Sequence, residues 1–264
     1  CAPQWRPTSE TFFSRTRFSL ISGMRPEAKP ITSRRPFHAM QRSDWSKFGN
    51  AYRDIVASGP AAMNAHHRAG ERVMQSGELV LMDYCPDLGY YRCDITRQWP
   101  VNGRFTADQR DLYGFYLGVY EAVLANIKPG LTSQQVLQNA LPTMDRVLAS
   151  ARFSKPLYAN AAKAFVDRYR ASAAPGGRGN LGHAVGMATH DFGGGSGVMR
   201  PGLVFTIEPE FRIPEENIFI RLEDMIVITP TKAEILSDFV PRSIAAVEKT
   251  IAEPGLLQRY GRIR

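Results

Sequence analysis

Two aspartates, Asp83 and Asp94, lie within the stretch LVLMDYCPDLGYYRCDITR, residues 79–97. Apolar, β-branched and aromatic runs flank a central PDLG, a pattern typical of a β-hairpin with its turn in the middle. With the tip at Leu88-Gly89, the two aspartates would face each other directly, with their Cβ atoms about 5 Å apart. Like charges placed in this way are destabilising unless a cation lies between them. The stretch therefore predicts a cation site.

Three later residues could complete such a site. Glu208 in VFTIEPE and Glu223 in IRLEDMIVIT each lie in a strand-like run, and His183 lies in the glycine-containing segment LGHAVGMATHD. Four carboxylates and one imidazole would form an oxygen-rich site for two divalent ions. Carboxylates suit Mn²⁺, Mg²⁺ or Ca²⁺, and imidazole extends the choice to Fe, Co and Zn. Because a two-metal site can hold a hydroxide at neutral pH and polarise a carbonyl, the set predicts hydrolysis.

The elements that must bring these motifs together are also visible in the sequence. The segment Thr106 to Gln109 has the form of a capping box, and apolar residues at helical spacing follow it as far as the Lys128-Pro129-Gly130 terminator. The other predicted elements are strands over residues 52–58, 181–191, 203–208 and 218–229, a helix that begins at Thr132 or Ser133 and is interrupted or kinked at Pro142, and helices over residues 157–171 and 243–251.

Charge and hydropathy exclude two classes of partner. The chain has a formal charge of +8, but residues 1–50 contain nine of its 33 basic and three of its 25 acidic residues. The remainder is close to neutral, so it predicts no basic nucleic-acid-binding surface. No run of about 18 apolar residues is present, so we expect no membrane span.

Cysteine usage predicts a reducing compartment, and we expect a cytoplasmic protein. The chain has three cysteines, an odd number that does not suit a disulfide scaffold. In the hairpin register above, Cys85 shares the face of Asp83, whereas Cys93 is adjacent to Asp94 and points to the opposite face. We therefore expect Cys93 in the core and no disulfide between Cys85 and Cys93.

Taken in order, the motifs LVLMDYCPDLGYYRCDITRQWPVNGRF, LGHAVGMATHD, VFTIEPE and IRLEDMIVIT resemble the successive signatures of the creatinase/aminopeptidase superfamily of pita-bread metallopeptidases. The segment DITRQWPVNGRFT is most similar to Xaa-Pro aminopeptidases and prolidases. The resemblance, over residues 52–229, implies an α+β pita-bread fold: a curved, mostly antiparallel sheet with helices on its outer face and a dinuclear metal site within. We expect residues 46–264 to form this catalytic domain, and the basic segment 1–45 to be poorly ordered or truncated.

The resemblance also implies roles for the candidate ligands. Asp83 would bind one ion, and Asp94 and Glu223 would bridge both. His183 and Glu208 would complete the shell of the second ion. Glu208 would also carry a proton from the bridging water to the leaving amine.

Three further residues match substrate-site positions of the superfamily. His66 stands where a substrate-site histidine precedes the hairpin, and His190 where a histidine contacts the substrate carbonyl or the tetrahedral intermediate. Arg221 matches an arginine beside the last ligand, and it would either bind substrate or serve as a structural ion-pair partner.

The activity implied is that of a metal-dependent exopeptidase. It would hydrolyse the N-terminal peptide bond of a small peptide, at Xaa-Pro bonds, by means of a metal-bridging hydroxide. The expected cofactors are two divalent ions, Mn²⁺ first, with Co²⁺, Zn²⁺ or Fe²⁺ as alternatives. We expect no nucleic-acid or membrane partner, and the resemblance leaves a homodimer open.

Two departures from the superfamily pattern keep alternatives open. Cys85 replaces a glycine two residues after the first aspartate, and Gly179 stands where prolidase-like members often have a histidine four residues before the metal histidine. One alternative is a methionine aminopeptidase-like enzyme, which shares the ligands and differs in the substrate pocket. Another is a catalytically silent binding module on the same fold. A creatinase-type amidinohydrolase is disfavoured, because it would not explain why all five ligands are kept.

Overall fold

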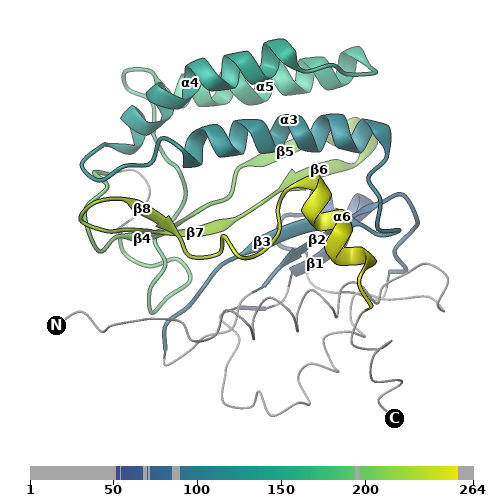
Figure 1. The fold of residues 1–264 in the computed structure, drawn as a ribbon, viewed down its shortest axis with the longest axis horizontal. Helices are drawn as coiled ribbons and strands as arrows, with labels where there is room; N and C mark the ends of the chain where they lie inside the picture. Colours follow the sequence, from purple (N-terminus) through teal and green to yellow (C-terminus); the bar gives the residue numbers. More distant parts are fainter. Residues whose placement is uncertain are drawn as a thin grey trace.

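The computed structural model describes residues 52–53, 55–67, 70, 72–84, 90–193 and 197–254 (Figure 1). The expected basic segment 1–45 and the predicted hairpin turn lie outside these residues. No helix in the described part of the chain is both long and apolar enough to cross a membrane.

All strands in the described residues pair in antiparallel fashion. They form one sheet in the order β1-β2-β3, a second in the order β4-β7-β8, and a two-stranded sheet of β5 and β6. The strands are β1 (Ile55–Ser58), β2 (Leu79–Asp83), β3 (Thr96–Pro100), β4 (Val204–Ile207), β5 (Glu210–Ile213), β6 (Ile218–Arg221), β7 (Asp224–Ile228) and β8 (Ala233–Ile235).

Helices cover one side of these strands, as Figure 1 shows for α3, α4 and α5. The described α-helices are α3 (Ala107–Leu124), α4 (Ser133–Ser150), α5 (Pro156–Ala173) and α6 (Ile244–Ala252). Two short 3₁₀ helices, η2 (Gly59–Met63) and η3 (Pro214–Glu216), follow β1 and β5. Antiparallel sheets with helices on one side confirm the expected α+β class.

The register of the β2–β3 pair differs from the prediction by two residues. Asp83 pairs with Thr96 and not with Asp94, and the pairing continues one step further where Tyr84 N donates to Ile95 O at 3.2 Å. The prediction assumed a symmetrical two-residue tip, whereas β2 ends at Asp83 and β3 begins only at Thr96. Because side chains alternate with a period of two, a shift of two residues keeps every side chain on its face. The shared face of the two aspartates therefore survives the error in register.

The expectation that Cys93 lies in the core is wrong. This residue is half-buried, and it is disulfide-bonded. Its partner lies outside the described residues, as does Cys85.

The predicted capping box at the start of α3 is confirmed. Gln109 N donates to Thr106 Oγ1 at 3.2 Å, and Thr106 N donates to Gln109 Oε1 at 3.0 Å. These bonds satisfy donors that have no partner within the helix. The predicted helices at residues 157–171 and 243–251 are confirmed as α5 and α6.

Helix α4 corrects the prediction of a break at Pro142, because it runs without interruption from Ser133 to Ser150. Proline removes one backbone hydrogen bond from a helix interior and locally favours a kink. Val136, Leu137 and Met144 are fully buried in the same helix, which packs against α3 and α5. Burial of these side chains favours a helix that continues through Pro142.

Two strand predictions need correction. The predicted strand at residues 218–229 is two strands, β6 and β7, which belong to different sheets and are separated by Leu222 and Glu223. The predicted strand at residues 181–191 forms only isolated bridges, from Ala184 to Asp191 and to Phe205. Both segments bear candidate ligands, so the chain departs from regular pairing where the ligands lie.

An aromatic core joins the helices to the strands. The rings of Phe115 on α3, Phe165 on α5 and Phe211 on β5 contact one another with centroid distances of 5.3–6.2 Å. All three are buried, and burying one such side chain contributes about 1.5–3 kcal/mol.

One face of α3 also forms hydrogen bonds to the sheet beneath it. Tyr113, Tyr116 and Tyr120 lie at helical spacing and are fully buried. Tyr116 Oη donates to Pro209 O and accepts from Leu222 N, each at 2.8 Å. Pro209 is adjacent in sequence to the candidate ligand Glu208, and Leu222 to the candidate ligand Glu223. Helix α3 therefore fixes the backbone that carries both glutamates.

We expect Tyr116→Phe to lower the free energy of unfolding by about 1–3 kcal/mol, because the buried Leu222 N loses its acceptor. Urea denaturation of both proteins measures the difference. The matched control is Tyr90→Phe, since Tyr90 is 80% exposed; its effect should stay within about 0.5 kcal/mol. Equal effects of the two substitutions would contradict the role assigned to the Tyr116 hydroxyl.

Candidate metal centre

Four of the candidate ligands lie at or near the end of a strand, and the fifth, His183, lies in a segment that forms only isolated bridges. Asp83 ends β2, Asp94 lies two residues before β3, Glu208 follows β4 and Glu223 precedes β7. His183 comes from the segment that bridges to Phe205 through Ala184. The β2–β3 and β4–β7 sheets meet here, since Glu223 N donates to Thr96 O at 3.1 Å.

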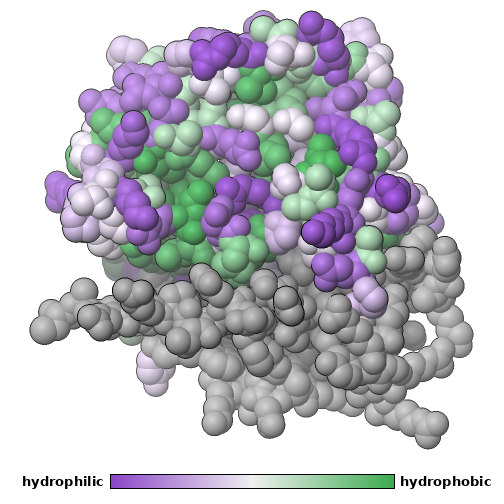
Figure 2. Space-filling model, in the orientation of Figure 1, coloured by the Kyte–Doolittle hydropathy of each residue, from purple (hydrophilic) through white to green (hydrophobic). Residues whose placement is uncertain are grey.

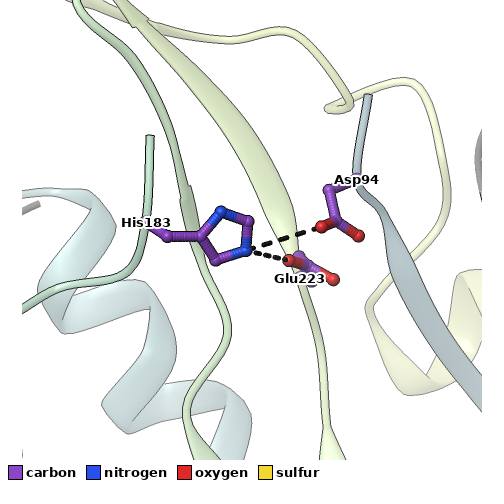
Figure 3. Close-up of side chains that lie close together, drawn as sticks. All are labelled: Asp94, His183 and Glu223. Atoms are coloured by element: carbon purple, nitrogen blue, oxygen red, sulfur yellow. Dashed lines mark ion pairs between the residues drawn. The ribbon is translucent and has the colours of Figure 1, made fainter. Parts of the chain in front are cut away.

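His183 faces three of the carboxylates. Its Nε2 atom lies 3.2 Å from Glu208 Oε1, 3.5 Å from Asp94 Oδ2 and 4.0 Å from Glu223 Oε1. Asp94, His183 and Glu223 each offer one ligand atom, and these atoms lie within 4.8 Å of one another (Figure 3). His183 Nδ1 lies 3.2 Å from Ala184 O. The tautomer that donates from Nδ1 to this carbonyl leaves the Nε2 lone pair for a metal.

Asp83 has a different environment. It forms a buried ion pair with Arg221 and accepts a hydrogen bond from Tyr52 Oη. The same hydroxyl lies 2.7 Å from Asp94 Oδ1. A phenol has a single proton, so Tyr52 can donate to only one of the two aspartates at a time. Arg221 Nη1 also lies 3.5 Å from Glu208 Oε2.

Burial raises the pKa of three of the four candidate carboxyl groups. Burial acts in the same direction on Glu208, but the hydrogen bond to His183 and the charge of Arg221 outweigh it and lower the pKa of that carboxyl. Burial raises the pKa of Asp94 to about 7, with the charge of Asp83 adding to the effect. Burial, and then the charges of Asp94 and Asp83, raise the pKa of Glu223 well above its usual value. The pKa of Asp83 is also raised by burial, although the Arg221 charge opposes the shift. The cluster therefore holds more negative charge than its arginine can balance, which a divalent cation would correct.

An unpartnered oxygen gives a direct test of whether these residues fit a metal. Glu223 is 1% exposed, and its Oε2 accepts a hydrogen bond from Thr96 Oγ1 at 2.9 Å. Its Oε1 is buried and has no hydrogen-bond partner within the described part of the chain. Leaving a carboxylate oxygen buried without a partner is costly. Since that oxygen faces His183 Nε2, the residues present fit a divalent ion.

Four of the five candidate ligands, all but Glu223, line a cavity of about 340 Å³. Its lining includes His66, Arg53 and Thr189 besides the ligand cluster. His190 lines it as well, and its ring stacks on that of His183 with a centroid distance of 3.9 Å and an interplanar angle of 16°. His66 and His190 are both exposed, as groups that contact a substrate must be.

The structure thus brings all eight predicted site residues to one cavity or its wall. Glu223 is not among the cavity-lining residues, but it lies directly behind them beside His183. Arg221 is only 1% exposed and is engaged with Asp83 and Glu208. Its substrate contact stays a prediction.

The sequence reasoning missed Tyr52 and Thr96. Thr96 carried a usable signal, because it lies two residues after Asp94 and strand alternation places it on the same face. No sequence pattern could have indicated Tyr52, since it precedes β1 and contacts Asp83 and Asp94, which lie 31 and 42 positions later.

Tyr52→Phe is expected to lower the free energy of unfolding of the metal-depleted protein by about 1.5–3 kcal/mol, the usual contribution of a hydrogen bond to a charged group. The loss should shrink when a divalent metal is added, because the cation then offsets the repulsion between Asp83 and Asp94. Denaturant unfolding with and without chelator measures both quantities. Tyr91→Phe, at a residue 65% exposed, is the control. A loss equal in both conditions would contradict the coupling.

The fold and the site together define a class of protein in which antiparallel sheets carry a carboxylate and histidine cluster, suited to a divalent ion, beside a cavity. The chain belongs to metallopeptidase family M24, whose family model matches residues 24–230.

Named relatives agree with this family. The chain is 32% identical over 210 residues to Xaa-Pro aminopeptidase 3 of Rattus norvegicus, covering 75% of this chain and 40% of the relative. It is 33% identical over 212 residues to Xaa-Pro aminopeptidase of Escherichia coli (strain K12), covering 75% and 46%. The chain thus spans less than half the length of these relatives.

Solved structures confirm the pita-bread fold. Aminopeptidase P from E. coli with the inhibitor Pro-Leu superposes with a TM-score of 0.71 at 26% identity, over 92% of this chain and 56% of that chain. Pseudomonas aeruginosa aminopeptidase PepP superposes with a TM-score of 0.72 at 24% identity, over 92% and 57%. Because the identity to the Pseudomonas aeruginosa protein is only 24%, this similarity shows the fold alone.

Proposed function

We propose that this chain is the catalytic part of a metal-dependent aminopeptidase that hydrolyses the N-terminal peptide bond of peptides whose second residue is proline. The observation that carries the proposal is the buried, unpartnered Glu223 Oε1, which faces His183 Nε2 beside Asp94. The names of the relatives support the choice of Xaa-Pro bonds.

The residues present suit a pair of divalent ions, for which we propose Mn²⁺. Asp83 would hold one ion, and Asp94 and Glu223 would bridge both. His183 and Glu208 would complete the coordination shell of the second ion. When bound, such ions act as Lewis acids and lower the pKa of water, which supplies a nucleophile at neutral pH.

The chain's own groups would perform the remaining steps. Glu208 is the most exposed of the four candidate carboxylates, with a side chain 28% exposed towards the cavity. Its Oε1 and Oε2 oxygens can take a proton from the attacking water and deliver it to the leaving amine. His66 and His190, at the accessible part of the cavity, would bind the substrate carbonyl. Arg221 would hold Asp83 in place through their ion pair.

The position of Gly179 bears on the proline pocket. Its backbone has a φ of +58°, and a Cβ there would lie 3.2 Å from Gln134 Cβ and 3.3 Å from Gln134 N. A histidine would be strained in this conformation. The chain is therefore built for glycine here, and we propose that other groups of the cavity, such as His66 and Thr189, shape the proline site.

The test is a hydrolysis assay on purified protein with Xaa-Pro peptides of graded length, after metal depletion and re-addition of Mn²⁺, Co²⁺ or Zn²⁺ in turn. We expect cleavage between the first residue and proline that depends on added metal. Met-Ala peptides are the matched comparison. Cleavage of Met-Ala alone would instead identify a methionine aminopeptidase-like enzyme.

Two other results would overturn the proposal. Full-rate cleavage of Xaa-Pro peptides by metal-depleted protein would exclude the metal-dependent chemistry. Absence of stoichiometric metal after supplementation, together with no hydrolysis, would favour a binding module on the same fold.

A further inference from the structure

Behind the ligand cluster lies a buried arginine, Arg97 on β3, which is 4% exposed. A guanidinium has five N–H donors in a rigid planar fork. Each donor of Arg97 has an acceptor. These acceptors are Val240 O for Nε at 3.2 Å, Thr96 O and Glu223 O for Nη1 at 2.9 and 2.6 Å, and Asp224 Oδ1 and Ser237 O for Nη2 at 2.5 and 3.1 Å.

Two of these acceptors belong to the seam between the ligand-bearing strands. Thr96 and Glu223 already contact each other twice, through Glu223 N to Thr96 O at 3.1 Å and Thr96 Oγ1 to Glu223 Oε2 at 2.9 Å. Arg97 Nη1 then donates to the carbonyl oxygens of both residues. One guanidinium nitrogen thus joins the strand that follows Asp94 to the peptide unit that carries Glu223.

Asp224 supplies the counter-charge to Arg97. It is fully buried, and its Oδ1 accepts from Ser237 Oγ at 2.6 Å while its Oδ2 accepts from Tyr120 Oη at 2.9 Å. Ser237 Oγ in turn accepts from Met225 N at 3.1 Å. Burying a charge is costly unless it is paired and hydrogen-bonded, and here every oxygen of the carboxylate is engaged.

The segment at residues 237–242 closes this network from outside the strands. It offers the carbonyls of Ser237 and Val240 to Arg97, and Arg242 Nη1 lies 3.6 Å from Asp224 Oδ2. Tyr113 Oη on α3 donates to Arg242 O at 2.7 Å, which holds the segment against the core. These residues follow position 230, where the match to the family model ends.

We propose that Arg97, Asp224 and residues 237–242 form a clamp that sets the spacing between Asp94 and Glu223, and that Arg97 is therefore a positioning residue for the metal centre. The inference rests on the metal site of the proposed function, but not on the identity of the peptide substrate. Lysine cannot replace Arg97, because an ammonium has three donors on a single nitrogen and cannot reach the four carbonyls and the carboxylate that the planar guanidinium contacts at once.

The experiment measures metal affinity in a way that fold stability alone would not change. Metal-depleted wild type and Arg97→Lys are titrated with Mn²⁺ by calorimetry, and with Co²⁺ by visible absorption, at a temperature where circular dichroism shows both folded. We expect the dissociation constant of Arg97→Lys to rise about 10- to 100-fold, as for other groups that orient metal ligands. The bands of bound Co²⁺ should shift as well, because the ligand spacing changes.

Two further variants sharpen the comparison. Ser237→Ala removes a hydroxyl from the clamp and keeps both charges, so we expect a smaller loss of affinity in the same direction. Arg110→Lys is the matched control, because Arg110 forms a half-exposed ion pair with Glu248 on the surface. Its metal affinity should stay within about twofold of wild type, since exposed ion pairs contribute little.

Each outcome decides the inference. Wild-type affinity and Co²⁺ bands in folded Arg97→Lys would overturn it and leave the clamp a purely structural feature. If Arg97→Lys does not fold, Ser237→Ala decides: weaker metal binding supports the clamp, and unchanged binding overturns it. A wild type that binds metal but cleaves no peptide would refute the proposed function while leaving this test intact. A wild type that binds no metal would overturn both.

Discussion

Asp94→Asn is expected to weaken metal binding by more than about 100-fold and to lower peptide hydrolysis at least as much, since even groups that only orient ligands contribute about 10- to 100-fold. The reason lies in the geometry around Asp94. Its Oδ2 faces His183 Nε2 at 3.5 Å, and its Oδ1 contacts Tyr52. The substitution keeps the shape of the side chain but removes its negative charge and one acceptor, so the proposed ligand is lost without opening a cavity.

The measurements are metal content after dialysis against Mn²⁺, calorimetric titration, and turnover of an Xaa-Pro peptide. Asp145→Asn provides the control, because Asp145 forms a half-exposed pair with Arg170 on the helical layer. That variant should bind metal and hydrolyse peptide as wild type does. Unchanged turnover in Asp94→Asn would refute the assignment of Asp94 as a ligand and, with it, the proposed dinuclear centre.

Metal addition itself is expected to produce the largest change in stability. A ligand that binds only the folded state stabilises it by about 2.7 kcal/mol at a free concentration 100 times its dissociation constant, and by about 4 kcal/mol at 1,000 times. For a chain of this size, each kcal/mol raises the midpoint of thermal unfolding by about 2–4 °C. We therefore expect Mn²⁺ at 1,000 times its dissociation constant to raise that midpoint by about 8–16 °C relative to chelator.

The physical cause is the imbalance of charge in the metal-free site. Asp83, Asp94 and Glu223 are buried together, and among the residues that the structure describes only Asp83 of these three has a direct arginine partner. A cation neutralises this cluster and gives Glu223 Oε1 the partner that it lacks. Thermal unfolding followed by circular dichroism provides the measurement. Asp94→Asn should respond much less to metal than wild type does, and equal midpoints for wild type in metal and in chelator would contradict a specific site.

Local signals predicted several elements because they act over a few residues. The Thr106 capping box predicted the start of α3, and the predicted helix over residues 243–251 is found as α6, which Ser243 caps by accepting from Ala246 N. Pro142 shows the limit of such reasoning. The helix is not interrupted at Pro142, because burial of α4 against two other helices favours its continuation.

For the site, the sequence by itself determined which residues could be ligands. Asp83, Asp94, His183, Glu208 and Glu223 follow from residue type, order and strand-like context. Even an error of two residues in the hairpin register left the aspartates on one face, because the alternation of side chains has a period of two.

Only the tertiary structure decided how these ligands are held. It divided the predicted strand at residues 218–229 between two sheets, and so placed Glu223 at their junction. It also paired Arg97 with Asp224 and with Val240, contacts that span 127 and 143 positions. A buried ion pair of this kind has no period in the sequence, because its partners are selected by the packing of separate segments and by the cost of leaving a buried charge unpaired.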